Sequence, residues 1–282
     1  MGVQGRMVIY ALEEQLAERA AITAFKRVAE LDQIASDYRP ASELNALARN
    51  AVGRPVRVSE DLFVMLQAAQ EVSSLSDGAF DITCGPLIQL WREARKTRKL
   101  PSPEQIDTAS RLVGWQKVKL DPANRTVQLD LAGMKLDLGG LAKGYAGDQV
   151  IKVLREKGIH NALFEFGGDI VVSDAPPGKE GWMVEIVAEK EGEEGKIIPL
   201  ANAAISTSGD LEQYVTIDGK RYSHIVDPRT GLGTTDRALV TVIGPNGLTT
   251  DPLTKTGSVM GQKARELEKA FPGTRIMVRT AR

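Results

Sequence analysis

Cysteine, histidine and long apolar runs are scarce in this sequence, and each scarcity excludes a class of protein. The single cysteine, Cys84, rules out an internal disulfide framework. Only two histidines, His160 and His224, are present, which argues against a multi-histidine metal site. No uninterrupted apolar stretch approaches the length that crosses a bilayer, so no transmembrane segment is expected in this chain.

Net charge is also close to zero, because 36 Lys and Arg residues are balanced by 37 Asp and Glu residues. No long basic run interrupts this balance, so we expect neither nucleic acid nor an anionic membrane as a partner. A hydrophobic content of 42% and a charged content of 26% are typical of a soluble globular protein. The 282 residues contain no internal repeat and no convincing linker, so they are predicted to form one domain over residues 1–282.

Three familiar motifs of nucleotide binding and catalysis are missing. The G-x-G-x-x-G spacing of a Rossmann fingerprint does not occur after a predicted strand, and no G-x-S-x-G elbow is present. Gly139 and Gly144 have the gap of a Walker A loop, but Tyr145 stands where that loop needs its lysine. Both familiar nucleotide loops and an α/β-hydrolase nucleophile are therefore excluded.

Apolar periodicity and turn residues predict a mixture of helices and strands. Helical spacing extends over residues 13–36 and 59–76, and Ser42, Gly85 and Ser102 are each expected to begin a shorter helix. Further helices are predicted after Gly139-Gly140, ending at Gly158, and over residues 251–260 and 263–271. Extended segments are predicted over residues 7–10, 79–83, 118–120, 126–131, 161–166, 170–172, 182–188, 196–200, 203–207, 215–217, 221–225, 239–243 and 275–280. The mixture predicts one compact α+β unit.

Residues 131–148, which read LAGMKLDLGGLAKGYAGD, are the most informative stretch. An apolar strand that carries Asp137 is predicted to run into Gly139-Gly140 and then into a helix that bears Lys143. Adjacent glycines let backbone N–H groups approach a ligand closely, and a helix N-terminus favours phosphate. A tight connection in which glycine only permits the turn is the alternative. The stretch alone leaves both interpretations open.

Other short motifs occur along the chain in a definite order. They are Met1-Gly2 before a strand, SDYRP at 36–40, GAFDIT at 78–83, the LDLGGLAKGYAGD stretch, GGDI at 167–170, ISTSGD at 205–210, YSHIVDPRTG at 222–231, and Asp251 ahead of SVMG at 258–261. Together they cover essentially the whole chain, and in this order they resemble the ApbE family, the FAD:protein FMN transferases. The resemblance implies an ApbE-like fold with mixed, largely antiparallel sheets flanked by helices.

The resemblance also implies an activity. Such proteins take FAD as substrate, split its pyrophosphate with a divalent metal, usually Mg²⁺, and attach FMN through a phosphoester to a threonine or serine of an acceptor protein, releasing AMP. Some members mainly hydrolyse FAD to FMN and AMP. Carried over by motif, the residues that would contact FAD or lie near it are Met1, Tyr38, Ala79, Phe80, Asp81, Asp137, Lys143, Gly168, Asp169, His224 and Ile225.

The same resemblance assigns a metal site and the proton transfer. The metal would be held by the Gly140 carbonyl, the Asp251 carboxylate and oxygen at Thr254 and at the next position, Lys255. Hard oxygen ligands suit a cation that neutralises a pyrophosphate. An acid or a histidine near the incoming hydroxyl would remove its proton, and the candidates are Asp251 and His224.

Lys255 departs from the family pattern, which has threonine four residues after the aspartate. The run here is TDPLTKT from Thr250, and an ammonium cannot ligate a cation. Three arrangements are open. Lys255 points away while the metal keeps more water; its ammonium replaces part of the metal's charge; or the site is impaired, which leaves an FAD-binding protein with little turnover. The first is preferred here.

The family context gives expectations for partner and compartment. The acceptor is expected to be a subunit of a membrane redox complex. Family members have the Met-Gly dipeptide after an export signal or a lipid-anchored leader, so this chain is expected to be a trimmed form of an exported protein, periplasmic or membrane-anchored. An FAD-binding protein and a metal-dependent FAD pyrophosphatase are the alternatives to transfer.

Overall fold

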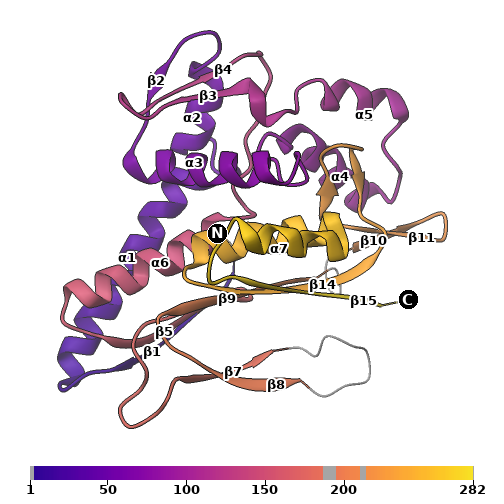
Figure 1. The fold of residues 1–282 in the computed structure, drawn as a ribbon. Coiled ribbons are helices and arrows are strands. Elements are labelled where there is room, and N and C mark those ends of the chain that lie inside the picture. Colours follow the sequence, from indigo (N-terminus) through magenta and orange to yellow (C-terminus); the bar gives the residue numbers. More distant parts are fainter. Residues whose placement is uncertain (1–2, 187–194, 210–213, 282) are drawn as a thin grey trace.

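A six-stranded sheet lies at the centre of the structure, a computed structural model that describes residues 3–186, 195–209 and 214–281 (Figure 1). Every pairing between neighbouring strands in it is antiparallel. In spatial order, its strands are β1 (Gly5–Tyr10), β5 (Asn161–Phe166), β6 (Asp169–Val172), β9 (Ala203–Gly209), β14 (Arg237–Gly244) and β15 (Arg275–Ala281). The first and the last strand of the chain therefore form the two edges of one sheet.

Three long helices cover one face of this sheet. They are α1 (Glu14–Ala35), α6 (Ala142–Glu156) and α7 (Gly247–Met260). α6 packs on β5 and β6, α7 packs on β9 and β14, and α1 packs on α6 (Figure 1). The main hydrophobic core fills the space between this layer and the sheet, with Phe164, Val240 and Leu253 among its fully buried side chains.

α6 and α7 approach each other so closely that only glycine fits between them. A β-carbon on Gly144 would lie 2.0 Å from the carbonyl oxygen of Gly247. Asp148 of α6 also caps α7, because its carboxylate accepts the N–H groups of Gly247 and Leu248 at 2.7 and 2.8 Å. Burial raises the pKa of Asp148 to about 6, although these two N–H groups oppose the shift. The contact fixes the relative positions of the two helices.

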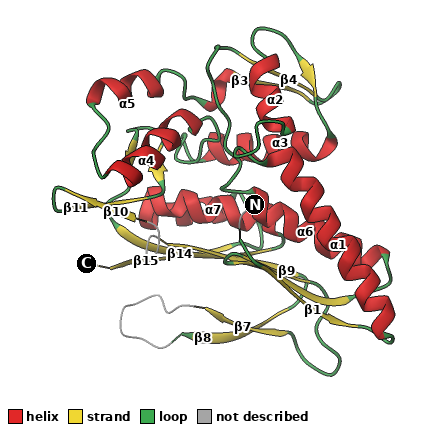
Figure 2. Cartoon of the chain, turned by 180° about the vertical axis from the view of Figure 1, so that it is seen from behind, coloured by secondary structure: helices red, strands yellow, loops and turns green. Residues whose placement is uncertain are grey.

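A second layer lies on the far side of these helices, as the view from behind in Figure 2 also shows. Its helices begin as the sequence predicts, since Ser42, Ser59 and Ser102 each accept the N–H group three residues further on. The elements of this layer are α2 (Glu43–Asn50), β2 (Val56–Arg57), α3 (Glu60–Leu75), α4 (Gly85–Thr97), α5 (Pro103–Ser110), the 3₁₀ turn Trp115–Lys117, β3 (Val118–Asp121) and β4 (Thr126–Leu129).

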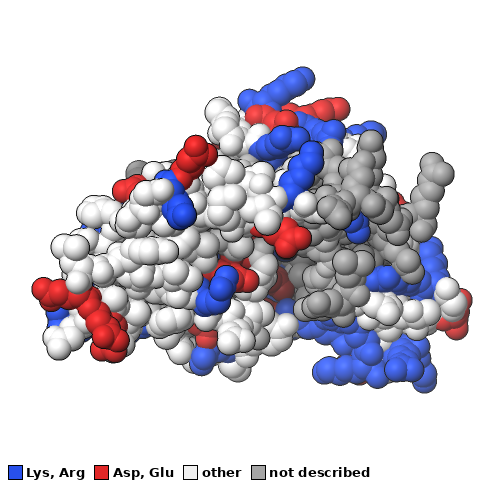
Figure 3. Space-filling model, turned by 90° about the horizontal axis from the view of Figure 1, so that it is seen from below, with Lys and Arg blue, Asp and Glu red and all other residues white. Residues whose placement is uncertain are grey.

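Three hairpins complete the chain. The turn Asp218-Gly219 joins β10 (Tyr214–Ile217) to β11 (Lys220–Ser223) with positive φ at both residues, as the sequence predicts. β12 (Val226–Asp227) pairs with β13 (Leu232–Gly233), and Trp91 of α4 donates its indole N–H to the Gly231 carbonyl at 2.9 Å. β7 (Trp182–Ile186) and β8 (Lys196–Leu200) lie on the other face of the sheet. Figure 3 shows that face as largely uncharged, with Lys and Arg gathered at one end.

Four predicted elements differ from the structure. Residues 79–83 form turns, because the Asp81 carboxylate accepts the Thr83 N–H at 2.8 Å, a local bond that competes with a strand. His224 and Ile225 lie in a break between β11 and β12, because the Ser223 hydroxyl accepts the N–H of Ile225. Residues 261–269 form a 3₁₀ helix, where an α-helix over 263–271 is predicted.

The fourth difference is in the informative stretch itself. Met134, Leu136 and Leu138 are buried in strand-like alternation, yet they join no sheet. The partner of this segment is the loop after α3: Lys135 forms an isolated bridge with Cys84, and Asp137 donates its N–H to the Ile82 carbonyl at 2.7 Å. Burial against a loop therefore produces the same alternation that a strand would.

Among the residues described, no helix combines the length and the apolar character that crossing a membrane requires.

Candidate active site

Most of the predicted flavin contacts line a single cavity of about 210 Å³. Its walls come from the loop between α1 and α2, the loop after α3, helix α4, the segment before α6, the break after β11, and α7. The predicted residues that line it are Tyr38, Ala79, Phe80, Asp81, Asp137, His224 and Ile225, with Gly140 and Lys255 from the predicted metal set. Segments far apart in the sequence thus converge here.

The remaining predicted residues do not line this cavity. Lys143 and Asp169 are joined to each other behind it, and Asp251 and Thr254 are fully buried beside them. Met1 falls outside the residues that the structure describes.

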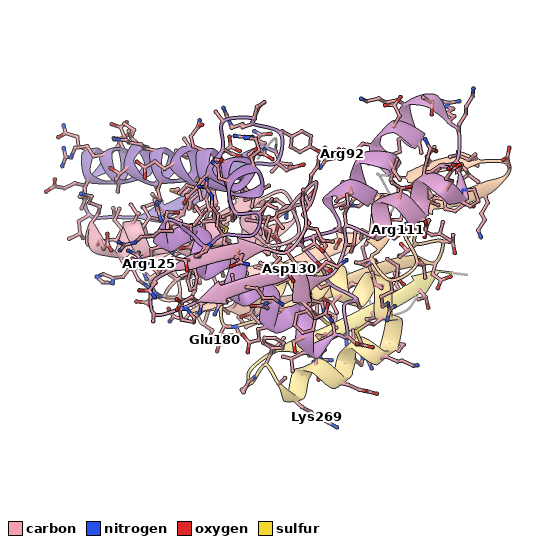
Figure 4. The ribbon with its side chains drawn as sticks, turned by 90° about the horizontal axis from the view of Figure 1, so that it is seen from above. Arg92, Arg111, Arg125, Asp130, Glu180 and Lys269 are labelled. Carbon is pink, nitrogen blue, oxygen red and sulfur yellow. The ribbon has the colours of Figure 1, made fainter. Side chains whose placement is uncertain are left out.

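Arg92 of α4 holds one wall of the cavity together. Its guanidinium donates to the carboxylates of Asp37 and Asp137, at 2.5 and 3.1 Å, and lies 4.2 Å from the ring centroid of Tyr38. Figure 4 shows Arg92 on the side of α4 that faces the rest of the molecule. Burial, with a smaller contribution from Asp37, raises the pKa of Asp137 to about 6 despite the nearby guanidinium. The clamp fixes the exposed ring of Tyr38 beside a buried carboxyl group.

Asp81 positions a loop. Its carboxylate accepts the Thr83 hydroxyl and the N–H groups of Thr83 and Trp115, at 2.6 to 2.8 Å. These bonds hold Ala79 and Phe80 against the cavity. We therefore assign to Asp81 the support of the wall, since its described hydrogen bonds are all to its own loop and to Trp115.

A tight hairpin places Asp169 beside Lys143. Gly167 and Gly168 form the two-residue turn between β5 and β6, with φ values of 61° and 91° that disfavour any other residue. Asp169 is the next residue and is only 3% exposed. Its carboxylate accepts a hydrogen bond from the ammonium of Lys143. The same ammonium lies 3.4 Å from both carboxylate oxygens of Asp251. The predicted Gly168-Asp169 turn is therefore connected to the cavity only indirectly, through Lys143, Asp251 and the cavity residue Lys255.

Asp251 lies at the centre of an ionic cluster of four residues, Lys143, Asp169, Asp251 and Lys255. Lys255 donates to its Oδ1 at 2.9 Å, and the Gly144 N–H donates to its Oδ2 at 3.1 Å. Burial would raise the pKa of Asp251, but the charges of Lys143 and Lys255 outweigh burial and lower that pKa to about 2. Burial and the charge of Asp251 raise the pKa of Asp169. Two lysines and two carboxyl groups therefore balance one another at the base of the cavity.

The structure corrects the preferred arrangement of Lys255. The side chain does not point away from the site, because its ammonium donates to Asp251 Oδ1 and to the Thr254 hydroxyl at 2.9 and 3.0 Å. Asp251 and Lys255 are four positions apart on α7 and so lie on the same side of the helix, which is the i, i+4 spacing that favours ion pairs.

These groups do not fit a divalent cation. Mg²⁺ needs oxygen ligands at about 2.1 Å in octahedral geometry. The Asp251 carboxylate and the Thr254 hydroxyl already accept hydrogen bonds from the ammonium of Lys255, which occupies the place of a cation between them. We therefore assign no reaction step to a metal ion.

The two candidate proton acceptors differ in their surroundings. His224 lines the cavity and is partly exposed. Asp251 is 0% exposed and carries a carboxylate whose pKa is lowered to about 2, mainly by Lys143 once burial is overcome. A group with so low a pKa is a weak base at neutral pH. Asp251 is also outside the cavity and paired with two lysines, so His224 is the better placed of the two candidates.

Arg92 and Arg95 are cavity residues that sequence reasoning missed. They are three positions apart on α4, so they share one side of the helix. Leu87, Trp91 and Ala94 form the buried face of that helix. Two arginines beside the buried face of a predicted helix are a sequence signal that could have indicated cavity-lining residues.

The ApbE family model matches residues 1–277, and the chain belongs to the ApbE family. A protein of Salmonella typhimurium described as an FAD:protein FMN transferase is 32% identical over 278 residues, which are 95% of this chain and 79% of that protein. A Vibrio cholerae protein of the same description is 31% identical over 239 residues, 83% of this chain and 71% of that protein.

Solved structures agree with this assignment. The flavin transferase ApbE of Vibrio cholerae superposes with a TM-score of 0.85 at 28% identity, over 99% of this chain and 90% of that one. The ApbE protein of Thermotoga maritima superposes with a TM-score of 0.87 at 29% identity, over 99% and 91%. The α+β fold inferred from the sequence is confirmed.

Proposed function

We propose that this chain is an FAD:protein FMN transferase. The observation that carries the proposal is the single cavity that is lined both by the arginine-clamped Tyr38 and by Lys255 of the ionic cluster. Aromatic and apolar groups suit the flavin ring, whereas ammonium groups suit a pyrophosphate. The relatives described as FAD:protein FMN transferases support the same assignment.

The proposed reaction exchanges one bond to phosphorus for another. A hydroxyl oxygen of the acceptor bonds to the phosphorus on the FMN side of the pyrophosphate. The bond from that phosphorus to the bridging oxygen breaks, and its electron pair stays on the oxygen of the departing AMP. His224 accepts the proton of the hydroxyl. Positioning and charge neutralisation supply most of the catalysis in such transfers.

A transfer assay tests this proposal. The purified protein is incubated with FAD and an acceptor that contains a threonine target, with and without Mg²⁺. Denaturing electrophoresis shows flavin fluorescence that is covalently attached to the acceptor, and chromatography measures AMP and free FMN. An acceptor with valine at the target position is the control. We expect fluorescence on the threonine acceptor together with an equal amount of AMP.

Other outcomes identify the alternatives. AMP with free FMN in the presence of the acceptor would indicate an FAD pyrophosphatase. Bound but intact FAD would indicate a flavin-binding protein. A protein without affinity for FAD would refute the proposal.

A histidine pair tests the proton acceptor. We expect His224→Asn to lower the transfer rate by about 10²–10⁴-fold while FAD still binds, because general base catalysis contributes about that factor. His160→Asn is the matched control, since His160 is exposed and outside the cavity. Equal losses in both variants would contradict the assignment.

The acceptor and the compartment belong to the same proposal. The acceptor is a subunit of a membrane redox complex, and the reaction takes place outside the cytoplasm. The likeness of the ordered motifs to the ApbE family supports both statements. Identification of the flavin-bearing protein in the native cell envelope tests them.

A further inference from the structure

The side chain of Lys255 runs along all the residues expected to hold a metal. A β-carbon on Gly140 would lie 3.2 Å from Lys255 Cγ, so the stem of the lysine lies against that glycine. Its ammonium then reaches Asp251 and Thr254 at 2.9 and 3.0 Å. A cation between these groups would have to displace the side chain.

The Asp251 carboxylate has no room for a further partner in this geometry. A carboxylate offers about four lone-pair sites. Oδ1 accepts from Lys255 and Lys143, and Oδ2 accepts from Gly144 N–H and Lys143, at 2.9 to 3.4 Å. Because each lone-pair position of the carboxylate already has a hydrogen-bond donor, a metal ion could bind Asp251 only by displacing at least one of these donors.

The charges of the ionic cluster are already balanced when Lys255 is present. With both carboxylates ionised, Lys143, Asp169 and Asp251 carry one net negative charge, and Lys255 makes the cluster neutral. A divalent cation in place of Lys255 would give one net positive charge. An ammonium has three N–H groups, and the two described bonds of Lys255 leave one for the cavity that it lines. That group can donate to a phosphate oxygen.

We propose that Lys255 takes the place of the divalent cation, so that this chain binds and cleaves FAD without a divalent metal ion. The ammonium donates to the pyrophosphate and offsets negative charge there, as lysine does as a point charge at phosphates. The bonds formed and broken are those of the transfer above, and Lys255 contributes no electrons. The inference rests on the proposed function for its substrate.

Metal binding is measured first, without reference to activity. Mn²⁺ is titrated into the protein, alone and with AMP, and electron paramagnetic resonance reports the free ion. The proteins are the wild type, Lys255→Thr, which restores the family pattern, and Lys255→Met, which supplies neither charge nor oxygen. Lys263→Thr on the exposed 3₁₀ helix is the matched control.

We expect only Lys255→Thr to gain a Mn²⁺ site. Wild-type affinity for FAD, followed by flavin fluorescence, should be equal in EDTA and in Mg²⁺. Lys255→Met should lower it about ten- to a hundredfold in both, since a hydrogen bond to a charged group contributes about that factor. Circular dichroism confirms that each variant folds.

Three results would overturn the inference: a Mn²⁺ site in the wild type, loss of wild-type FAD binding in EDTA, or no Mn²⁺ site in folded Lys255→Thr. Failure of the two proposals can be told apart. Transfer that occurs only with Mg²⁺ overturns the inference and leaves the proposed function. FAD binding unaffected by EDTA, without transfer to any acceptor, removes the transferase proposal and the cleavage that rests on it, and supports metal-free binding of FAD.

Discussion

Substitution of Gly144 by alanine tests whether the contact between α6 and α7 builds the ionic cluster. A β-carbon there would lie 2.0 Å from the Gly247 carbonyl oxygen and 2.9 Å from Asp251 Cβ. Ordinary contacts are about 3.5 Å, so the helices would have to separate by more than about 1 Å. Such overpacking costs about 1–3 kcal/mol. The separation also stretches the 3.1 Å bond from Gly144 N–H to Asp251, worth about 1.5–3 kcal/mol.

The two contributions together predict that Gly144→Ala lowers the free energy of unfolding by about 2.5–6 kcal/mol. Urea denaturation measures this loss, and a fluorescence titration measures FAD affinity, which should fall because Lys143 and Asp251 lie on the two separated helices. Gly158→Ala is the control. Gly158 follows the C-terminus of α6, has φ of 78° and has no atom within 4 Å of its β-carbon position.

The control variant carries only the cost of a left-handed residue, about 1–2 kcal/mol. It should leave FAD affinity unchanged, because no group of the cluster is near it. If Gly144→Ala proves no more destabilising than Gly158→Ala, the helices have room to adjust and the reasoning fails.

Two further predictions concern titration and the arginine clamp. Because the pKa of Asp148 is raised from 3.8 to about 6 on folding, mainly by burial, its stabilising contribution is present below about pH 3.8 and is lost as pH rises through about 6. Asp148→Asn should therefore remove up to about 3 kcal/mol of pH dependence from urea denaturation between pH 4 and 7; an unchanged pH profile would contradict this. Arg92→Lys should weaken FAD binding about ten- to a hundredfold, because lysine cannot join Asp37, Asp137 and the Tyr38 ring at once. Arg111→Lys is the control in the same titration, because Arg111 forms an exposed ion pair with Asp107. Equal FAD affinities of the Arg92→Lys and Arg111→Lys variants would show that the clamp is dispensable.

Several features of the fold can be predicted from the sequence because their signals are local. The caps at Ser42, Ser59 and Ser102, and the Asp218-Gly219 turn, depend on neighbours within a few residues. The ordered motifs from SDYRP to SVMG indicate the family, and the family model bears this out. These features follow from backbone preferences and short spacings, which a sequence displays directly.

Other features depend on contacts between distant segments, which no spacing shows. The alternation of Met134, Leu136 and Leu138 predicts a strand, but the segment is buried against a loop. Arg92 becomes a clamp only because α4 lies between the loop that carries Asp37 and the segment that carries Asp137. Burial of one side of an extended segment looks the same in sequence whichever element covers that side.

The ordered motifs that include LDLGGLAKGY indicate the family, and the lysine at position 255 is equally plain in the sequence. The tertiary structure alone decides what that position does. α6 and α7 meet at Gly144 and Gly247, which brings the ammonium groups of Lys143 and Lys255 to one buried carboxylate, Asp251. A buried charge requires a partner, and here the packing of two distant helices supplies two ammonium groups to one carboxylate.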